Sequence, residues 1–85
     1  MTAHLSPDDH FADREAFSVF LARFRADHVE NGADWENGTL DSFLEALEAW
    51  VSDSPGWYSN HGQDLPPTGD WDFFARALRA ARNYE

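Results

Sequence analysis

Apolar residues recur with the period of an α-helix between residues 40 and 51, more regularly than elsewhere in the chain. They are Leu40, Phe43, Leu44, Leu47, Trp50 and Val51. An α-helix has 3.6 residues per turn, so positions at these spacings share one face. Thr39 can cap the first turn with its hydroxyl oxygen. The pattern predicts a helix over 40–52, ended by Pro55 and Gly56, whose apolar face must pack against other elements.

A second stretch of helical spacing lies nearer the N-terminus. It consists of Phe17, Phe20, Leu21, Phe24 and His28. Asp13 is a suitable N-cap, and Asn31 with Gly32 tolerates the left-handed backbone found at helix C-termini, so we expect a helix over 14–29. Upstream, Ser6 to Asp9 combine a capping serine, a proline and two acids, which favours a short N-terminal helical turn.

A third helix is predicted over 71–83, with Asp70 as its cap. Its apolar residues fall on two faces, one with Trp71, Phe74, Ala75 and Leu78 and the other with Phe73, Ala77, Ala80 and Tyr84. A helix with two apolar faces lies between two neighbours. Segment 53–70 is interrupted by prolines and glycines and is expected to be a long ordered loop. The sequence therefore predicts an all-α fold, a compact bundle of three main helices.

Size and composition limit what this bundle can be. The chain has 85 residues, enough for a single helical domain spanning 1–85. A 42% hydrophobic fraction that includes seven Phe and four Trp excludes a disordered acidic tail. The absence of cysteine excludes disulfides, thiolate nucleophiles and cysteine-ligated zinc. No stretch is apolar enough for a signal peptide or a membrane span, so we expect a cytoplasmic protein.

The charge of the chain is concentrated in its middle. The formal net charge is -10, which disfavours direct binding to nucleic acid or to an anionic membrane. Residues 26–75 contain eleven acids, no Lys or Arg, and all four tryptophans. This segment predicts an acidic, aromatic surface that docks on a basic protein partner. The candidate partner-binding residues are Asp34, Trp35, Glu36, Asp41, Glu45, Glu48, Asp53, Trp57 and Tyr58.

Nothing in the sequence predicts catalysis, a cofactor or a metal. The chain lacks the phosphate-loop, nucleophile-elbow, HExxH and dinucleotide motifs, so we expect a protein that is not an enzyme. The segment from Asp34 to Glu45 partly resembles a calcium loop. However, Gly38 stands where a ligand side chain is needed and Thr39 stands where the loop requires glycine. The four histidines show no metal-ligand spacing.

The chain also resembles a known family in its Trp-Glu-Asn segment, its Leu-Glu-Ala-Leu segment and its Tyr-Glu ending. The matching positions are Trp35-Glu36-Asn37, Leu40, Leu44 to Leu47, Ala49-Trp50, Tyr58, Asn60, Trp71, Ala75, Leu78 and Tyr84-Glu85. It resembles a set of small acidic bacterial proteins defined only as a domain of unknown function, over roughly residues 17–85. The resemblance implies no activity, ligand or catalytic residue.

Two hypotheses of function follow from these patterns, together with two further alternatives. The first is an acidic protein-interaction module, such as an inhibitor, an immunity-type protein or a regulatory subunit, that binds a basic surface. The second is a small-ligand or metal-binding module with a polar-aromatic pocket near Trp35, Asn37, Tyr58 and Asn60. Mimicry of nucleic acid by rows of carboxylates is a third alternative, and a homodimer closed by the exposed aromatic loop is a fourth.

Overall fold

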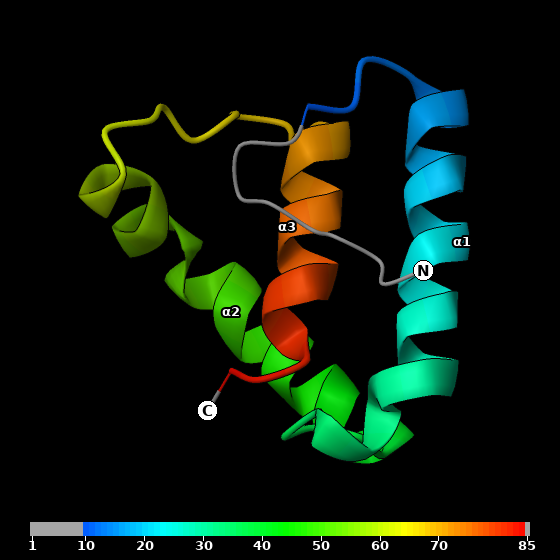
Figure 1. Cartoon of the computed structure of the whole chain (residues 1–85). Helices are drawn as coiled ribbons and strands as arrows, with labels where there is room; N and C mark the ends of the chain where they lie inside the picture. Colours follow the sequence, from blue (N-terminus) through cyan, green and yellow to red (C-terminus); the bar gives the residue numbers. More distant parts are fainter. Residues whose placement is uncertain (1–9, 85) are drawn as a thin grey trace.

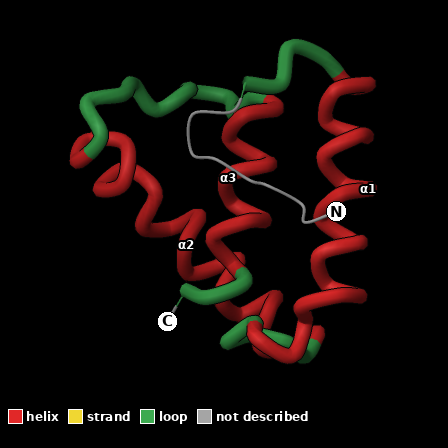
Figure 2. Tube along the Cα trace, in the orientation of Figure 1, coloured by secondary structure: helices red, strands yellow, loops and turns green. Residues whose placement is uncertain are grey.

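Three helices make up the fold, as expected. The computed structural model describes residues 10–84, and the predicted turn at Ser6 to Asp9 lies outside them. The helices are α1 (Arg14–Asn31), α2 (Leu40–Asn60) and α3 (Trp71–Ala81), with a short 3-10 helix, η1 (Gly32–Asp34), after α1 (Figure 1). The described residues contain no strand, and they pack to a radius of gyration of 12.7 Å (Figure 2). The all-α prediction is confirmed.

Helix α3 is the centre of the bundle, as its two apolar faces predict. It packs against both α1 and α2, whereas no Cα atom of α1 comes within 8 Å of one in α2 (Figure 1). Ala75, Ala77 and Ala81 of α3 are buried, and their small side chains let both neighbours approach closely. Helices α1 and α2 contact each other through aromatic side chains and not through closely packed backbones. The ring centroids of Phe24 in α1 and Phe43 in α2 lie 6.1 Å apart.

Helix α2 is longer than the sequence predicts. The expected stop at Pro55 and Gly56 is wrong, because the helix continues through both residues to Asn60. A proline inside a helix removes the N–H that would bond to the carbonyl four residues earlier, here that of Val51. The Ser54 hydroxyl replaces it by donating to the Val51 oxygen at 2.8 Å. The chain turns only at Gly62, with φ +63°, and the loop is 61–70 instead of 53–70.

The other two helices differ from expectation mainly at their ends. Helix α1 reaches Asn31, and the predicted left-handed cap is wrong because Gly32 has φ -58° and begins η1. A side chain there would be tight instead: a Cβ atom on Gly32 would lie 3.0 Å from Cδ2 of His28, so the imidazole would have to shift. Helix α3 ends at Ala81, two residues before the predicted end. No helix within residues 10–84 combines the length and apolar character needed to cross a membrane.

The buried face of α2 coincides only in part with the face that its apolar spacing predicts. The buried residues are Ala46, Trp50, Ser54 and Tyr58, a row spaced by four. Ser54 and Tyr58 lie beyond the predicted end of the helix at residue 52, and Tyr58 is helical only because α2 continues past Pro55. Half of the predicted apolar face therefore remains in solvent, where Leu40, Leu44 and Val51 are 74%, 51% and 42% exposed.

Candidate functional site

A stripe of apolar side chains lies along the solvent side of α2. We call Leu40, Leu44, Leu47 and Val51 the leucine stripe; they stand at i, i+4, i+7 and i+11, so they share one line along the helix. At 1.5 Å per residue the stripe is about 17 Å long. Leu47 is partly buried against the core residues Trp50 and Tyr58, while the other three members are exposed. Isolated exposed leucines are ordinary, but a continuous stripe is typical of a binding surface.

Carboxylates run parallel to this stripe. Asp41, Glu45 and Glu48, the acidic row, each follow one residue after a member of the stripe, which turns them by about 100° around the helix. All three are exposed, and none forms a hydrogen bond or an ion pair with another described residue. Their charges are therefore available to a partner.

The other acids of the middle segment mostly have structural partners. Asp70 caps α3 by accepting from the Phe73 N–H at 2.8 Å, and Asp72 accepts from the Phe11 N–H at 2.5 Å. Asp53, predicted to face a partner, accepts a hydrogen bond from the Tyr84 hydroxyl. That bond raises the pKa of Tyr84 above its ordinary 10.0.

Two more of the predicted acids lie near the turn between α1 and α2. Asp34 is exposed in η1, and Glu36 is held through its backbone N–H, which donates to Oδ1 of Asn83 at 3.2 Å. The predicted acidic surface is therefore reduced to the acidic row on α2, with Asp34 and Glu36 just before its start.

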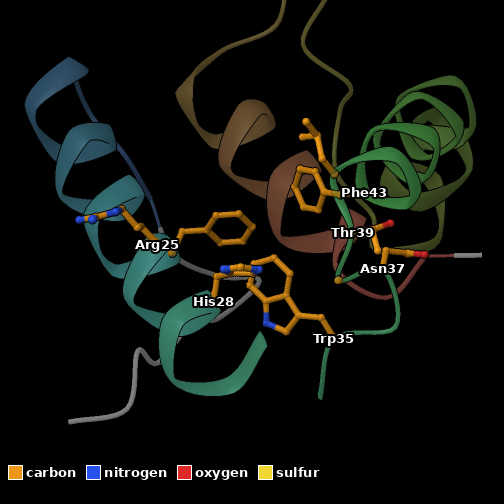
Figure 3. Close-up of a pocket in the computed structure, with 9 residues that line it drawn as sticks. Arg25, His28, Trp35, Asn37, Thr39 and Phe43 are labelled. Atoms are coloured by element: carbon orange, nitrogen blue, oxygen red, sulfur yellow. The ribbon is translucent and has the colours of Figure 1, made fainter. Parts of the chain in front are cut away.

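An aromatic pocket opens at the N-terminal end of the leucine stripe. It has a volume of about 370 Å³, and its walls come from the second half of α1, from the segment after η1 and from the first turn of α2. Figure 3 shows the rings of His28, Trp35 and Phe43 turned toward one another, whereas the Arg25 guanidinium points away from them. Leu40 lines the pocket and also begins the stripe, so the two features form one continuous surface.

The wall of the pocket is fixed from behind by a buried carboxylate. Asp27, 6% exposed, accepts hydrogen bonds from Trp35 Nε1 at 2.9 Å, Asn31 Nδ2 at 3.0 Å and Arg82 Nη1 at 3.1 Å. Burial acts to raise the pKa of Asp27, but the three hydrogen bonds and the charge of Arg82 outweigh it and hold the pKa below 3.8. The indole of Trp35 is thereby held in one orientation against Phe24, at 5.1 Å between centroids.

The four residues of the predicted ligand pocket do not come together. Trp35 and Asn37 line the aromatic pocket, but Tyr58 and Asn60 lie near the other end of α2, about 30 Å along the helix from its start. Asn37 has a structural function, because its amide nitrogen donates to the carbonyls of Ala81 at 3.0 Å and Tyr84 at 2.8 Å. Asn60 is exposed at the end of the helix.

Tyr58 and Trp57 belong to the far end of the core. Tyr58 is buried and its hydroxyl accepts from Arg76 Nη1 at 3.1 Å. Trp57 stacks on His61 at 3.9 Å between centroids, and the Arg76 guanidinium lies 4.5 Å from its ring. These two predicted partner-binding residues are therefore occupied by packing within the chain. In residues 10–84 no cluster of three metal-ligating side chains occurs.

A protein-family model matches residues 13–85, nearly the whole chain. The chain belongs to DUF7660, a family of unknown function. The resemblance found in the sequence is thereby confirmed. No curated protein and no solved structure matches this DUF7660 chain.

Sequence reasoning missed two parts of the site in this DUF7660 member. Phe24 and His28 were assigned to a packed helical stripe, yet they form a wall of the pocket. The leucine stripe was assigned to the core, yet it is mostly exposed. The available signal was the second helical row, Ala46 to Tyr58 at intervals of four, which competes with the leucine stripe for the buried face.

Proposed function

We propose that the chain is a protein-binding module that docks an amphipathic, basic helix of another protein on α2. One observation carries the proposal: an exposed apolar stripe runs beside a row of carboxylates that have no partner in the described chain. Apolar burial supplies affinity, and the charges supply orientation and a faster encounter. A module of this kind serves as an inhibitor, an immunity-type protein or a regulatory subunit, and needs no catalytic group.

The geometry of α2 indicates what kind of segment would fit. The apolar stripe is about 17 Å long, about three helical turns, and the parallel acidic row, from Asp41 to Glu48, is about 10 Å long. A partner helix with leucine-like residues at i, i+3 and i+4 and a neighbouring row of Lys or Arg matches both features. Because Asp41, Glu45 and Glu48 lie on one flank only, the basic row of the partner lies on one flank as well.

Like charge argues against a second copy of this chain as the occupant. Around a twofold axis, an antiparallel pair of α2 helices would place the two acidic rows on the same side of the interface, where they repel. Mimicry of nucleic acid needs two rows of carboxylates, and the described helices carry one. The fourth acid of α2, Asp53, is also exposed, and it accepts a hydrogen bond from the Tyr84 hydroxyl.

Photocrosslinking from the stripe tests the proposal. A photoreactive amino acid replaces Leu44 in one variant and Leu21, an exposed residue of α1, in the control. We expect a partner to be captured from position 44 and not from position 21. This partner is then purified and titrated against the wild-type protein and a Glu45→Lys/Glu48→Lys variant. Reversing two of three charges should weaken binding by about tenfold or more at low salt, and less at high salt.

Three results would overturn the proposal. The first is equal capture from both positions, the second is a partner whose affinity is indifferent to the reversed charges, and the third is capture of a second copy of the chain itself. Glu15→Lys/Glu30→Lys on α1 serves as the matched charge control, because it changes the net charge by the same amount away from the stripe.

A further inference from the structure

We propose that the aromatic pocket receives one large neutral side chain, best an aromatic ring, from the end of the helix docked on α2. This inference rests on the proposed function and names the anchor residue of the partner. Its first support is continuity: Leu40 belongs to both the stripe and the pocket and is 74% exposed, so nothing in the described chain separates the two. The end of a partner helix that lies on the stripe therefore reaches the pocket.

The chemistry of the walls selects the class of side chain. Phe24, Trp35 and Phe43 form a contiguous aromatic wall, with centroids 5.1 to 6.1 Å apart. Two hydrogen-bonding groups of the wall are already used: Trp35 Nε1 donates to Asp27, and the Thr39 hydroxyl bonds to Ser42. Apart from the imidazole of His28 and the guanidinium of Arg25, the pocket offers a guest mainly ring faces and carbon surface.

The positive charge of Arg25 beside the pocket favours a neutral anchor over a cationic one. Arg25 lines the pocket on its α1 side, and its guanidinium points away from the rings (Figure 3). No described residue forms an ion pair with Arg25. A Lys or Arg side chain of the partner would be repelled by the charge of Arg25, whereas the acidic row would attract that side chain. The basic row and the anchor are therefore different residues of the partner.

The pocket is formed before any partner arrives. Asp27 holds the indole of Trp35, and the imidazole of His28 packs edge-on against it with centroids 5.0 Å apart. Gly32, which has no Cβ, leaves the space that the imidazole occupies. A wall that is already ordered has little conformational entropy to lose on binding, which favours its use as an anchor site.

The position of the pocket also gives the docked segment a direction along α2. Because the pocket opens beside Leu40, the anchor lies over the N-terminal end of α2, and the rest of the partner extends toward Val51. The anchor thus occupies one end of the partner helix, and its Lys or Arg row begins next to it, over Asp41.

The experiment uses two synthetic helical peptides as probes. Each has about 15 residues, with leucines at helical spacing and lysines on one flank. One carries phenylalanine at the anchor position and the other carries alanine. Affinities are measured by calorimetry against the wild-type protein, Leu44→Glu and Phe43→Leu, whose folding is checked by thermal unfolding. The wild-type protein labelled with 5-fluorotryptophan reports pocket occupancy through the fluorine resonance of Trp35.

We expect the phenylalanine peptide to bind about tenfold or more tightly than the alanine peptide, and to shift the Trp35 resonance. Phe43→Leu should reduce that difference, while Leu44→Glu should weaken both peptides. If both peptides bind equally and Leu44→Glu weakens both, the anchor inference fails and the proposed function stands. If Leu44→Glu changes nothing, the proposed function fails. If free indole shifts the fluorine resonance of Trp35 but neither peptide does, the pocket binds a small molecule and the inference is overturned.

Discussion

Replacing Asp27 with asparagine should destabilise the fold more than any other single loss of an acidic charge in the described chain. The carboxylate is 6% exposed and accepts three hydrogen bonds, one of them from the charged Arg82. Asparagine has the same shape but presents an amide group to donors, and it leaves Arg82 without its counter-charge.

The magnitude follows from burial. Removing one partner of a fully buried ion pair costs about 3–5 kcal/mol. The Arg82 side chain is 22% exposed and can regain some hydration, so we place the loss at the lower end, about 3 kcal/mol. For a domain of this size that corresponds to a fall of about 12–24 °C in Tm. Asp34→Asn, in an exposed position of η1, is the matched control and should change stability by less than about 0.5 kcal/mol.

The assay is urea unfolding followed by circular dichroism at several pH values. Because the folded-state pKa of Asp27 lies below its ordinary 3.8, the folded chain releases this proton more readily than the unfolded chain. The stabilisation is therefore fully present above about pH 5 and is lost as the pH falls through 3.8 toward the folded-state pKa. The gap between wild type and Asp27→Asn should narrow below about pH 4. A loss under about 1 kcal/mol at neutral pH, or a gap that widens in acid, would refute the reasoning.

Four further predictions concern single positions. Ser54→Ala should lower the free energy of unfolding in urea by about 1 kcal/mol, because it removes the hydroxyl that donates to the Val51 carbonyl in place of the missing proline N–H. An unchanged free energy of unfolding would show that water satisfies this carbonyl equally well. Asp53→Asn should lower the alkaline titration midpoint of Tyr84, followed by absorbance, because the carboxylate that raises its pKa is gone; an unchanged midpoint would contradict the bond. Gly62→Ala should destabilise by about 1–2 kcal/mol, since its φ is +63°. Gly56→Ala, inside α2 with open space around it, should stabilise by about 0.5–1 kcal/mol.

Helical periodicity was sufficient to predict the three helices and the central place of α3. The caps at Asp13, Thr39 and Asp70 were also correct, since each accepts a hydrogen bond from the first turn of its helix. These features depend on residues close together in the chain. Helix α2 was predicted too short because proline is a strong local signal, and the neighbouring serine that compensates for it is a weaker one.

The candidate site was only partly predictable, for a related reason. Asp41, Glu45 and Glu48 were identified from charge alone, and they are exposed. Trp57 and Tyr58 were misplaced because the error at Pro55 removed them from a helix. The pocket depends on residues from α1 and α2 meeting across the bundle, and no local pattern shows which ring faces which.

The central helix of this fold is the last one in the chain, which has a consequence for how the protein is made. Helices α1 and α2 leave the ribosome before the element on which both of them pack. At a synthesis rate of about 5–20 residues per second, the 21 residues from the end of α2 to the end of α3 take about 1 to 4 s. Until α3 has been made, the faces of α1 and α2 that pack on it have no partner, so the native structure forms only after its last helix has been synthesised.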